Sequence, residues 1–293
     1  MHSVQITIPR RRWYSIGAEY RRDLPATWED VAPARRLPLL RALLSKPGTG
    51  GRIAALRLLL NVPAGAFLGL SDLDVAALLE RVSWLDCSPD PEPILASFEH
   101  RGRTYHAPKG HGLNLVALEY PIADEAFGKF LRTGNLEDLR LLIATLYREE
   151  NPDKDAVERR GDLRIPLRSR WEAEARAGRL SGLSAEVATA GLMYFAGVKL
   201  YIHQMYGKAL FEQEDEEKPG ADSAGESNTA NPLGWWGVYF NLAQDGPFGR
   251  NVEEVYQTSF HDVCLFLADR KRQQERMQMQ QRMQSTDFGI ETH

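Results

Sequence analysis

A long helical pattern from Asn251 to Gln284, which changes character halfway along, constrains this chain more than any other feature. In its first half, apolar residues recur three and four positions apart, so that one face can pack on a core. After Ala268 the apolar stripe stops, although the residues up to Gln284 are strong helix formers without Gly, Pro or a β-branched side chain. The sequence therefore predicts a helix whose polar half is either an exposed extension or a handle for another molecule. The residues of the apolar stripe are Val252, Val255, Tyr256, Phe260, Val263, Cys264 and Leu267.

Composition places the chain among ordinary globular proteins. It has 293 residues, of which 43% are hydrophobic and 26% are charged. The formal net charge of -4 is too small to indicate nucleic acid or an acidic surface by itself. The charge is nevertheless uneven, because residues 212–226 are strongly acidic whereas the N-terminal part is basic. The basic residues there are Arg10, Arg11, Arg12, Arg21, Arg22, Arg35 and Arg36.

The two cysteines and the lack of a long apolar run predict a location. Cys87 and Cys264 lie far apart on apolar helix faces or their ends, which favours buried free thiols in a reducing compartment and leaves one long-range disulfide open. The N-terminus has no apolar run of signal-peptide length. The most apolar stretch, 56–70, is interrupted by Asn61, Pro63 and two glycines and is shorter than the roughly 20 residues that a bilayer span requires. We expect a cytosolic protein without membrane contact.

Hydrophobic periodicity predicts a mainly α fold, an irregular multi-helix bundle with little β structure. We expect helices at 34–44, 51–62, 71–85, 122–131, 136–147, 168–177 and 184–211, with Ser71 and Asn135 as N-caps. The helix at 184–211 is apolar on most sides, so it is expected at the centre, where Gly191 and Gly197 allow neighbours to approach closely. A short N-terminal strand, Val4 to Ile8, and one small β-hairpin near 95–107, closed around Gly102, complete the prediction.

Three parts follow from this organisation. Residues 1–211 form a mainly helical domain with the small hairpin. Residues 212–231 are rich in acids, Gly and Pro and are expected to be a disordered linker or loop. Residues 232–293 combine an aromatic segment with the long C-terminal helix, and this part is expected to pack back on the first domain with its polar end exposed. No large apolar residue follows Phe211 in this segment, so it cannot form a core of its own.

Histidines and cysteines in this sequence do not form a recognisable metal or catalytic motif. His100, His106 and His111 are spaced unlike any standard zinc pattern, and we interpret them as surface and turn residues. His261 and Cys264 are three residues apart on one helix, which permits a Cys-His pair. However, Cys264 lies on the apolar stripe, where burial raises the pKa of a thiol and makes it inert. We therefore expect no catalytic residue, no cofactor and no metal.

The N-terminal arginines support an alternative function. Arg10, Arg11, Arg12 and the pair at 21–22 could contact phosphates, with Trp13 and Tyr14 available for stacking. The acidic net charge and the lack of a nucleic-acid-binding motif favour a solvated or interface-forming arm. A regulatory or nucleic-acid-binding protein is nevertheless retained as the alternative to a contact protein.

Contact with another protein is expected through the aromatic segment and the polar half of the last helix. Four aromatics in the stretch after Asn231 cannot form a stable short helix in water alone, so they must fold back on the protein or onto a partner. The Gln and Met content after Ala268 suits partner helices better than DNA. The expected partner-binding residues are Trp235, Trp236, Tyr239, Phe240, Arg270, Arg272, Arg276, Met277, Met279 and Met283.

Three segments taken together resemble a protein family of tailed phages and prophages of Bacteroidetes-type bacteria. They are 135–148 (NLEDLRLLIATLYR), 153–160 (DKDAVERR) and 192–197 (LMYFAG), with 165–167 (IPL) in the place of that family's "lp" element. The helix at 169–179 departs from the family's pattern. A further segment, 255–271 (VYQTSFHDVCLFLADRK), is similar to the C-terminal helix of small tail-assembly proteins encoded beside the tape-measure protein.

The resemblance implies a non-enzymatic role in a phage-like tail or its assembly, similar to a tape-measure chaperone. Its implied partners are other tail proteins, a tape-measure or tube protein among them, and a homo-oligomer is left open. The implied location is the cytosol of a bacterial host or the virion tail. The resemblance assigns no functional residue to any position of this chain.

Overall fold

The computed structural model describes residues 2–8, 18–28, 30–46, 48–61, 67, 70–86, 93, 95–110, 112–153, 155, 161–210 and 234–287. The side chains of 2–8, 18–22, 33, 208–209 and 282–287 are outside this description. The fold is mainly α, as the sequence predicts, with two small antiparallel sheets. Within the described residues, no helix is both long enough and apolar enough to span a membrane. The acidic segment 212–231, Cys87, His111, Arg10, Arg11, Arg12, Trp13 and Tyr14 lie outside the described residues.

The N-terminal region has its own small core. Strand β1 (His2–Ile8) contains the predicted strand and pairs antiparallel with β2 (Ala18–Leu24), which the sequence analysis missed. Helices α1 (Pro33–Ser45), α2 (Thr49–Leu60) and α4 (Asp72–Arg81) follow, and the short 3-10 helix η1 (Ser83–Asp86) ends this region. Ser71 is the N-cap of α4, as predicted, because its hydroxyl accepts from the backbone N–H of Asp74. The Asp74 carboxylate accepts from the backbone N–H of Ser71 in return, which completes a capping box that was not predicted.

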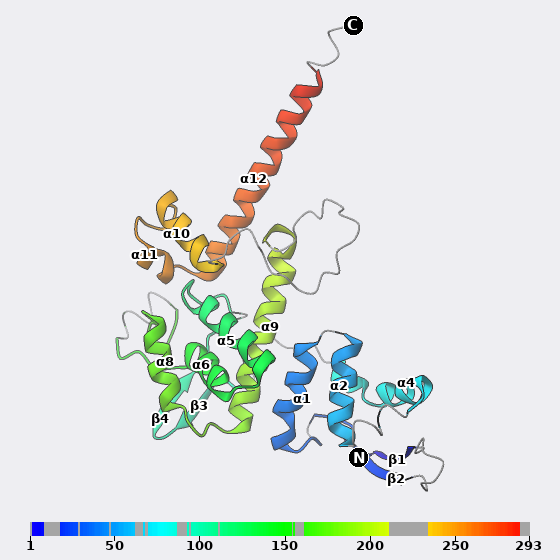
Figure 1. The fold of residues 1–293 in the computed structure, drawn as a ribbon. Helices are drawn as coiled ribbons and strands as arrows, with labels where there is room; N and C mark the ends of the chain where they lie inside the picture. Colours follow the sequence, from blue (N-terminus) through cyan, green and yellow to red (C-terminus); the bar gives the residue numbers. More distant parts are fainter. Residues whose placement is uncertain are drawn as a thin grey trace.

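Helix α9 (Ala185–Leu210) runs through the middle of the molecule, as the sequence predicts (Figure 1). It packs against α1, α5 (Glu119–Thr133) and α6 (Leu136–Leu146). A Cβ added at Gly191 would lie 2.0 Å from Cδ1 of Ile143 on α6, so a larger residue here would require the Ile143 side chain to move. Leu192, Tyr194 and Phe195 of α9 are completely buried, which places the centre of the main core on this helix.

The predicted hairpin consists of β3 (Ser97–His100) and β4 (Arg103–His106). Its two turn residues, Arg101 and Gly102, both have positive φ, which is the conformation of a two-residue type I′ turn. A two-residue strand, β5 (Arg148–Glu149), pairs with β4 and was not predicted. Helix α8 (Arg170–Arg179) lies on the same side of the molecule as this sheet and packs on α6 (Figure 1).

The C-terminal region differs from the prediction in one respect. The expected continuous helix is divided into α11 (Val252–Gln257) and α12 (Phe260–Asp287), with extended backbone at Thr258 between them. The break occurs because this stretch makes backbone hydrogen bonds with the segment before α5. The N–H of Ala117 donates to Thr258 O at 2.8 Å, and the N–H of Phe260 donates to Leu115 O, also at 2.8 Å. Tertiary pairing therefore overrides helix propensity at this point.

Candidate functional site: a projecting helix on an aromatic platform

The base of α12 is fixed in the core by an aromatic stack. The rings of Phe260 and Tyr120 lie 4.0 Å apart at an angle of 10°. One turn further on, Val263 and Cys264 are completely buried, and Ala268 is the last buried residue of α12 among the described side chains. The apolar stripe of the sequence thus anchors the N-terminal end of α12 in the core, because residues three and four apart share one face.

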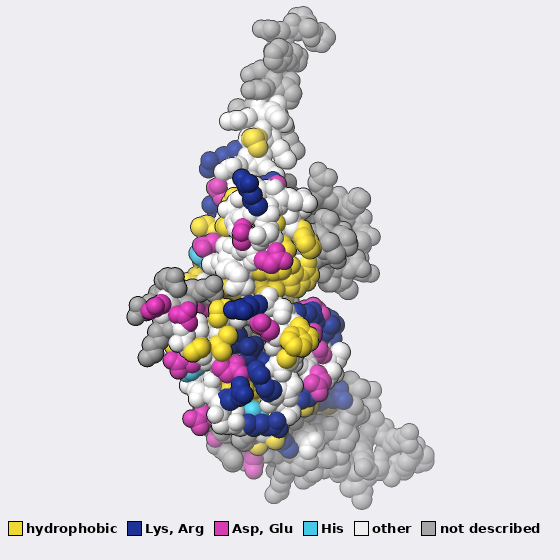
Figure 2. Space-filling model, turned by 90° about the vertical axis from the view of Figure 1, so that its left-hand side faces the viewer, with side chains coloured by type: hydrophobic (Ala, Val, Ile, Leu, Met, Phe, Trp, Pro, Cys, Tyr) yellow, Lys and Arg dark blue, Asp and Glu magenta, His cyan; other side chains and the backbone are white. Residues whose placement is uncertain are grey.

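Beyond Ala268, α12 leaves the body of the protein and forms what we call the stalk, residues 269–281. All described side chains of the stalk are exposed apart from that of Lys271, which is half-buried. Figures 1 and 2 show it projecting from the body, and few hydrophobic side chains are visible on the part of it that Figure 2 colours. At 1.5 Å per residue, the stalk extends by about 20 Å.

Side chains of the stalk differ in what they offer a partner. Arg270 forms an ion pair with Asp245 at the end of α10 (Trp235–Asp245), so the stalk is braced at its foot. Arg272 and Arg276 are exposed. Met277 and Met279 expose 55% and 66% of their surface, which is unusual for large apolar side chains on a helix that has polar residues all round. The side chain of Met283 lies outside the described residues.

Side chains that are two positions apart on a helix project in different directions. Met277 and Met279 therefore present apolar groups on two sides of the stalk rather than on one narrow stripe. Methionine is flexible and polarizable, and it adapts to irregular apolar surfaces. This arrangement suits a groove, or a pair of helices, that encloses the stalk.

The aromatic segment on α10 serves mainly as a platform for α12. Trp235 packs edge-on against Phe260 at 5.0 Å and against Tyr120 at 5.7 Å. Trp236 packs edge-on against Tyr256 at 5.8 Å. Both tryptophans are half-buried, and Phe240 exposes 48% of its surface.

Tyr239 was predicted to contact a partner, and this prediction is wrong because the side chain is completely buried. Its hydroxyl donates a hydrogen bond to the carbonyl of Ala117 at 2.7 Å. Burial raises the pKa of Tyr239 well above 10, so the hydroxyl remains a donor at neutral pH. Tyr239 therefore ties α10 to the segment before α5, and its chemistry is used within the fold.

The histidine and the cysteine on α12 face different surroundings. The hydroxyl of Tyr206 on α9 lies 2.6 Å from Nδ1 of His261, so these two side chains share a hydrogen bond. Cys264 is a free thiol, and its burial raises its pKa to about 12. At neutral pH the thiolate required for nucleophilic chemistry is scarcely populated. Among the described residues there is also no group of His, Cys, Asp or Glu that could hold a metal ion, His100 and His106 included.

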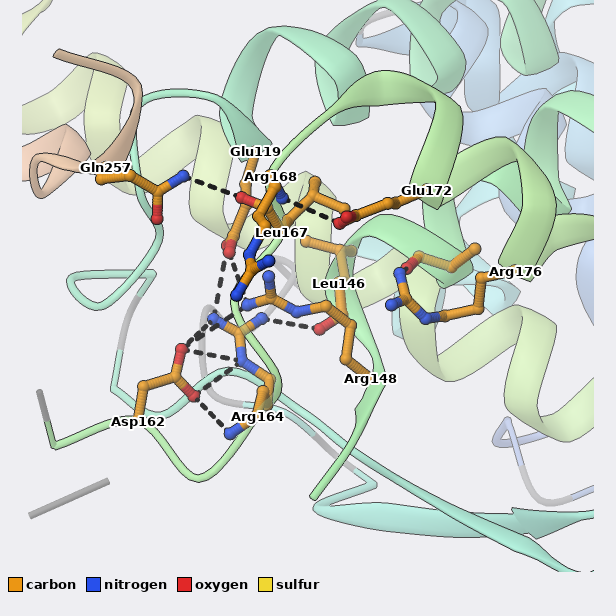
Figure 3. A network of polar contacts seen from close by, with 11 residues as sticks. Glu119, Leu146, Arg148, Asp162, Arg164, Leu167, Arg168, Glu172, Arg176 and Gln257 are labelled. Carbon is orange, nitrogen blue, oxygen red and sulfur yellow. Dashed lines mark hydrogen bonds and ion pairs between the residues drawn. The ribbon is translucent and has the colours of Figure 1, made fainter. Parts of the chain in front are cut away.

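The most unusual chemistry of the body is a buried network of charges beneath the start of α5 (Figure 3). Glu119, Arg148 and Arg164 are each 1% exposed. Nη2 of Arg148 lies 2.5 Å from Oε1 of Glu119, and Nη2 of Arg164 lies 3.3 Å from Oε2 of the same carboxylate. Asp162, which is 15% exposed, pairs with Arg164 at 2.7 Å and with Arg148 at 3.5 Å. Two cations and two anions are thus held together, and their charges balance.

The network joins segments that are far apart in the chain. Arg164 also donates to the carbonyl of Leu146 at 2.7 Å, which links the loop after Gly161 to the end of α6. Burial lowers the pKa of Arg164, but the attraction of Glu119 and the bonds to Asp162 outweigh this effect and raise it. For Arg148, burial and the neighbouring Arg164 dominate, and its pKa falls to about 10. Both arginines remain charged at neutral pH.

The chain was compared with known proteins. No family model, no curated protein and no solved structure matches it.

The sequence analysis missed the buried charge network because its members are scattered. Glu119 precedes the predicted helix at 122–131, whereas Asp162 and Arg164 lie in a stretch without periodicity. Arg148 follows directly after the apolar helix at 136–147, where a charged residue normally marks a return to solvent, so its position gave no signal of burial. Several residues in the segments that carry the family resemblance are also completely buried. They are Tyr147, Leu167, Leu192, Tyr194 and Phe195.

Proposed function

We propose that this chain is a non-enzymatic assembly protein that binds a helical partner through the stalk of α12. The observation that carries the proposal is the contrast along one helix, buried up to Ala268 and exposed from Asp269 onward. An isolated polar helix of this length is only marginally stable in water. The buried first part of α12 therefore keeps the stalk helical before a partner binds. Preformed structure lowers the conformational entropy lost on binding.

The partner class that we propose is a component of a phage-like tail, a tape-measure or tube protein. Support comes from the resemblance of residues 255–271 to the C-terminal helix of tail-assembly proteins, together with the geometry of the stalk. Helices that enclose the stalk could bury Met277 and Met279 from two sides, and acidic residues on them could pair with Arg272 and Arg276. Exposed pairs of this kind contribute selectivity more than affinity.

The test compares the full chain with a chain that ends at Ala268. Each is mixed with the tape-measure or tube protein encoded in the same genome, and complex formation is measured by size-exclusion chromatography with light scattering. We expect a complex with the full chain and none with the shortened one. The shortened chain should keep its melting temperature within about 2 °C, because the stalk buries little.

A matched pair of variants locates the contact within the stalk. Met277→Ser with Met279→Ser should weaken the complex about tenfold or more, since each buried apolar side chain contributes roughly 1.5–3 kcal/mol. Gln274→Ala with Gln278→Ala, on another side of the same helix, should leave it within about threefold. The proposal fails if the shortened chain binds as well as the full one, or if no tail protein binds the full chain.

A further inference from the structure

Helix α8 has an outward face that the stalk hypothesis does not use. Its inward side chains, Ala173, Arg176 and Ala177, are buried, whereas Trp171 exposes 74% of its surface. A tryptophan is the side chain with the largest apolar surface, and together with arginine it is the type most enriched among residues that dominate binding energy. Figure 2 looks onto the side where α8 and β4 lie in Figure 1, and it shows Lys and Arg side chains gathered down the middle of this side of the body.

Four arginines lie near the C-terminal end of α8, and three of them contact the carboxylate of Glu149. Arg103 of β4 and Arg179 of α8 approach the same oxygen of Glu149, at 3.5 and 3.1 Å. Arg176 takes the other oxygen at 3.0 Å. Burial raises the pKa of Glu149, but the hydrogen bonds that its carboxylate accepts, Arg176 included, outweigh burial and lower it. The exposed fractions of the Arg103 and Arg179 side chains are 57% and 48%, so both guanidinium groups keep donors open to solvent.

The fourth arginine is held beside them by a tight turn. Arg101 donates from Nη2 to the hydroxyl of Ser181 at 2.8 Å and to its carbonyl at 3.2 Å. It occupies a turn position with φ of 51°, where Asn, Asp and Gly are the usual residues. A left-handed conformation is unfavourable for arginine, and here it places a further positive charge at the end of α8.

Between the tryptophan and the arginines, the outward face of α8 carries two small residues and Glu174, which is paired with Arg170. Ala175 is exposed there, and a Cβ added at Gly178 would meet nothing within 4 Å. Trp171 and Arg179 are eight positions apart, which corresponds to about 12 Å along the helix axis. A segment of about four extended residues spans that distance.

We propose that the outward face of α8 and the β3–β4 turn form a second docking surface, which binds an acidic peptide segment of a partner protein. Carboxylates of that segment bind Arg103 and Arg179, and an apolar side chain about four residues away covers Trp171. Charge complementarity decides the occupant, because the exposed arginines Arg101, Arg103 and Arg179 outnumber the acids beside them although the whole chain carries -4. Those acids are Glu149 and Glu174, and Glu174 is already paired with Arg170. Glu149 already shows how a carboxylate fits between these guanidinium groups.

A peptide is favoured over nucleic acid by the same balance of charge. A long polyanion would meet the net negative charge of the protein, whereas a short acidic segment interacts only with the local positive patch. This surface is separate from the stalk, so the outcome of the test of one proposal does not decide the other.

The experiment measures binding of a fluorescein-labelled peptide that carries two glutamates and, about four residues away, a leucine. Fluorescence anisotropy is recorded with the full chain at low and moderate salt. We expect saturable binding that weakens with salt and is abolished when the glutamates are replaced by glutamines. Arg103→Glu with Arg179→Glu should weaken binding about tenfold or more, and Trp171→Ala should weaken it several-fold.

Two controls separate binding from folding and from charge in general. Arg176 keeps its bond to Glu149 in the double variant, so the fold should persist, which circular dichroism checks. Arg35→Glu, an exposed arginine on α1, changes the net charge without touching this surface and should leave the affinity unchanged. The proposal is overturned by equal binding of the glutamine peptide or the double variant, by no binding of the acidic peptide, or by a preference for a labelled RNA oligonucleotide.

Discussion

The buried charge network and the stalk are both rich in arginine, yet the two regions use it in opposite ways. In the network, Arg148 and Arg164 are 1% exposed and are fixed by Glu119 and Asp162. In the stalk, basic residues such as Arg272 and Arg276 project into solvent. The network has little tolerance for change, because a charge that loses its partner inside a protein is costly. The stalk contributes little to its own fold, and its side chains can be changed with small effects on stability.

The largest effect should follow from removing the carboxylate that both buried arginines share. Glu119→Gln leaves Arg148 and Arg164 with one anion fewer, and breaking a buried ion pair in this way costs about 3–5 kcal/mol. We expect the free energy of unfolding, measured by urea denaturation, to fall by that amount.

Its matched control lies in the stalk. Glu275→Gln makes the same chemical change at an exposed position and should alter the free energy of unfolding by less than about 0.5 kcal/mol. Equal losses in the two variants would remove the distinction between the regions.

A loss of similar size should follow from changing the joint between body and stalk. Phe260→Ala removes a ring that stacks on Tyr120 and contacts Trp235, and truncation of a buried aromatic costs about 3–5 kcal/mol. The fluorescence of Trp235 should also change, because its neighbour is lost. Binding through the stalk should also weaken if the aromatic contacts of Phe260 orient α12. An unchanged free energy of unfolding would show that Phe260 does not anchor this helix.

Acidification should weaken the network gradually. Burial raises the pKa of Asp162, but its bonds to Arg164 and the attraction of Arg148 bring it below the usual 3.8. A lowered carboxylate pKa adds stability that is fully present above the unfolded-state pKa and is lost as pH falls through the folded-state pKa. We therefore expect the free energy of unfolding to decrease below about pH 4, with a flatter pH profile in Asp162→Asn. Superimposable profiles of the two proteins would contradict this.

Local signals in the sequence predicted much of the helical framework. Ser71 and Asn135 cap α4 and α6 as expected, because their side chains accept from backbone N–H groups two or three residues ahead. Gly102 marked the hairpin because the type I′ turn requires positive φ. The apolar spacing up to Ala268 predicted where α12 leaves the body. The partner-binding roles given to its polar side chains stay predictions.

Contacts between distant segments were not predictable in the same way. The strand β5 has only two residues and exists because β4 lies beside it. The division of the last helix at Thr258 depends on hydrogen bonds to the segment 115–118, far away in the chain. Tyr239 was assigned to a surface for the same reason, since no local pattern shows that Ala117 offers its hydroxyl a carbonyl.

By itself, then, the sequence determined which stretches are helical, how α4 and α6 begin, and where the apolar stripe of α12 ends, because capping, turn chemistry and periodicity act over a few residues. Only the tertiary structure decided which arginines are buried beside acids and which face water. A charged side chain looks the same in either setting, and its burial depends on partners such as Glu119 and Asp162 that chain folding brings together from separate segments.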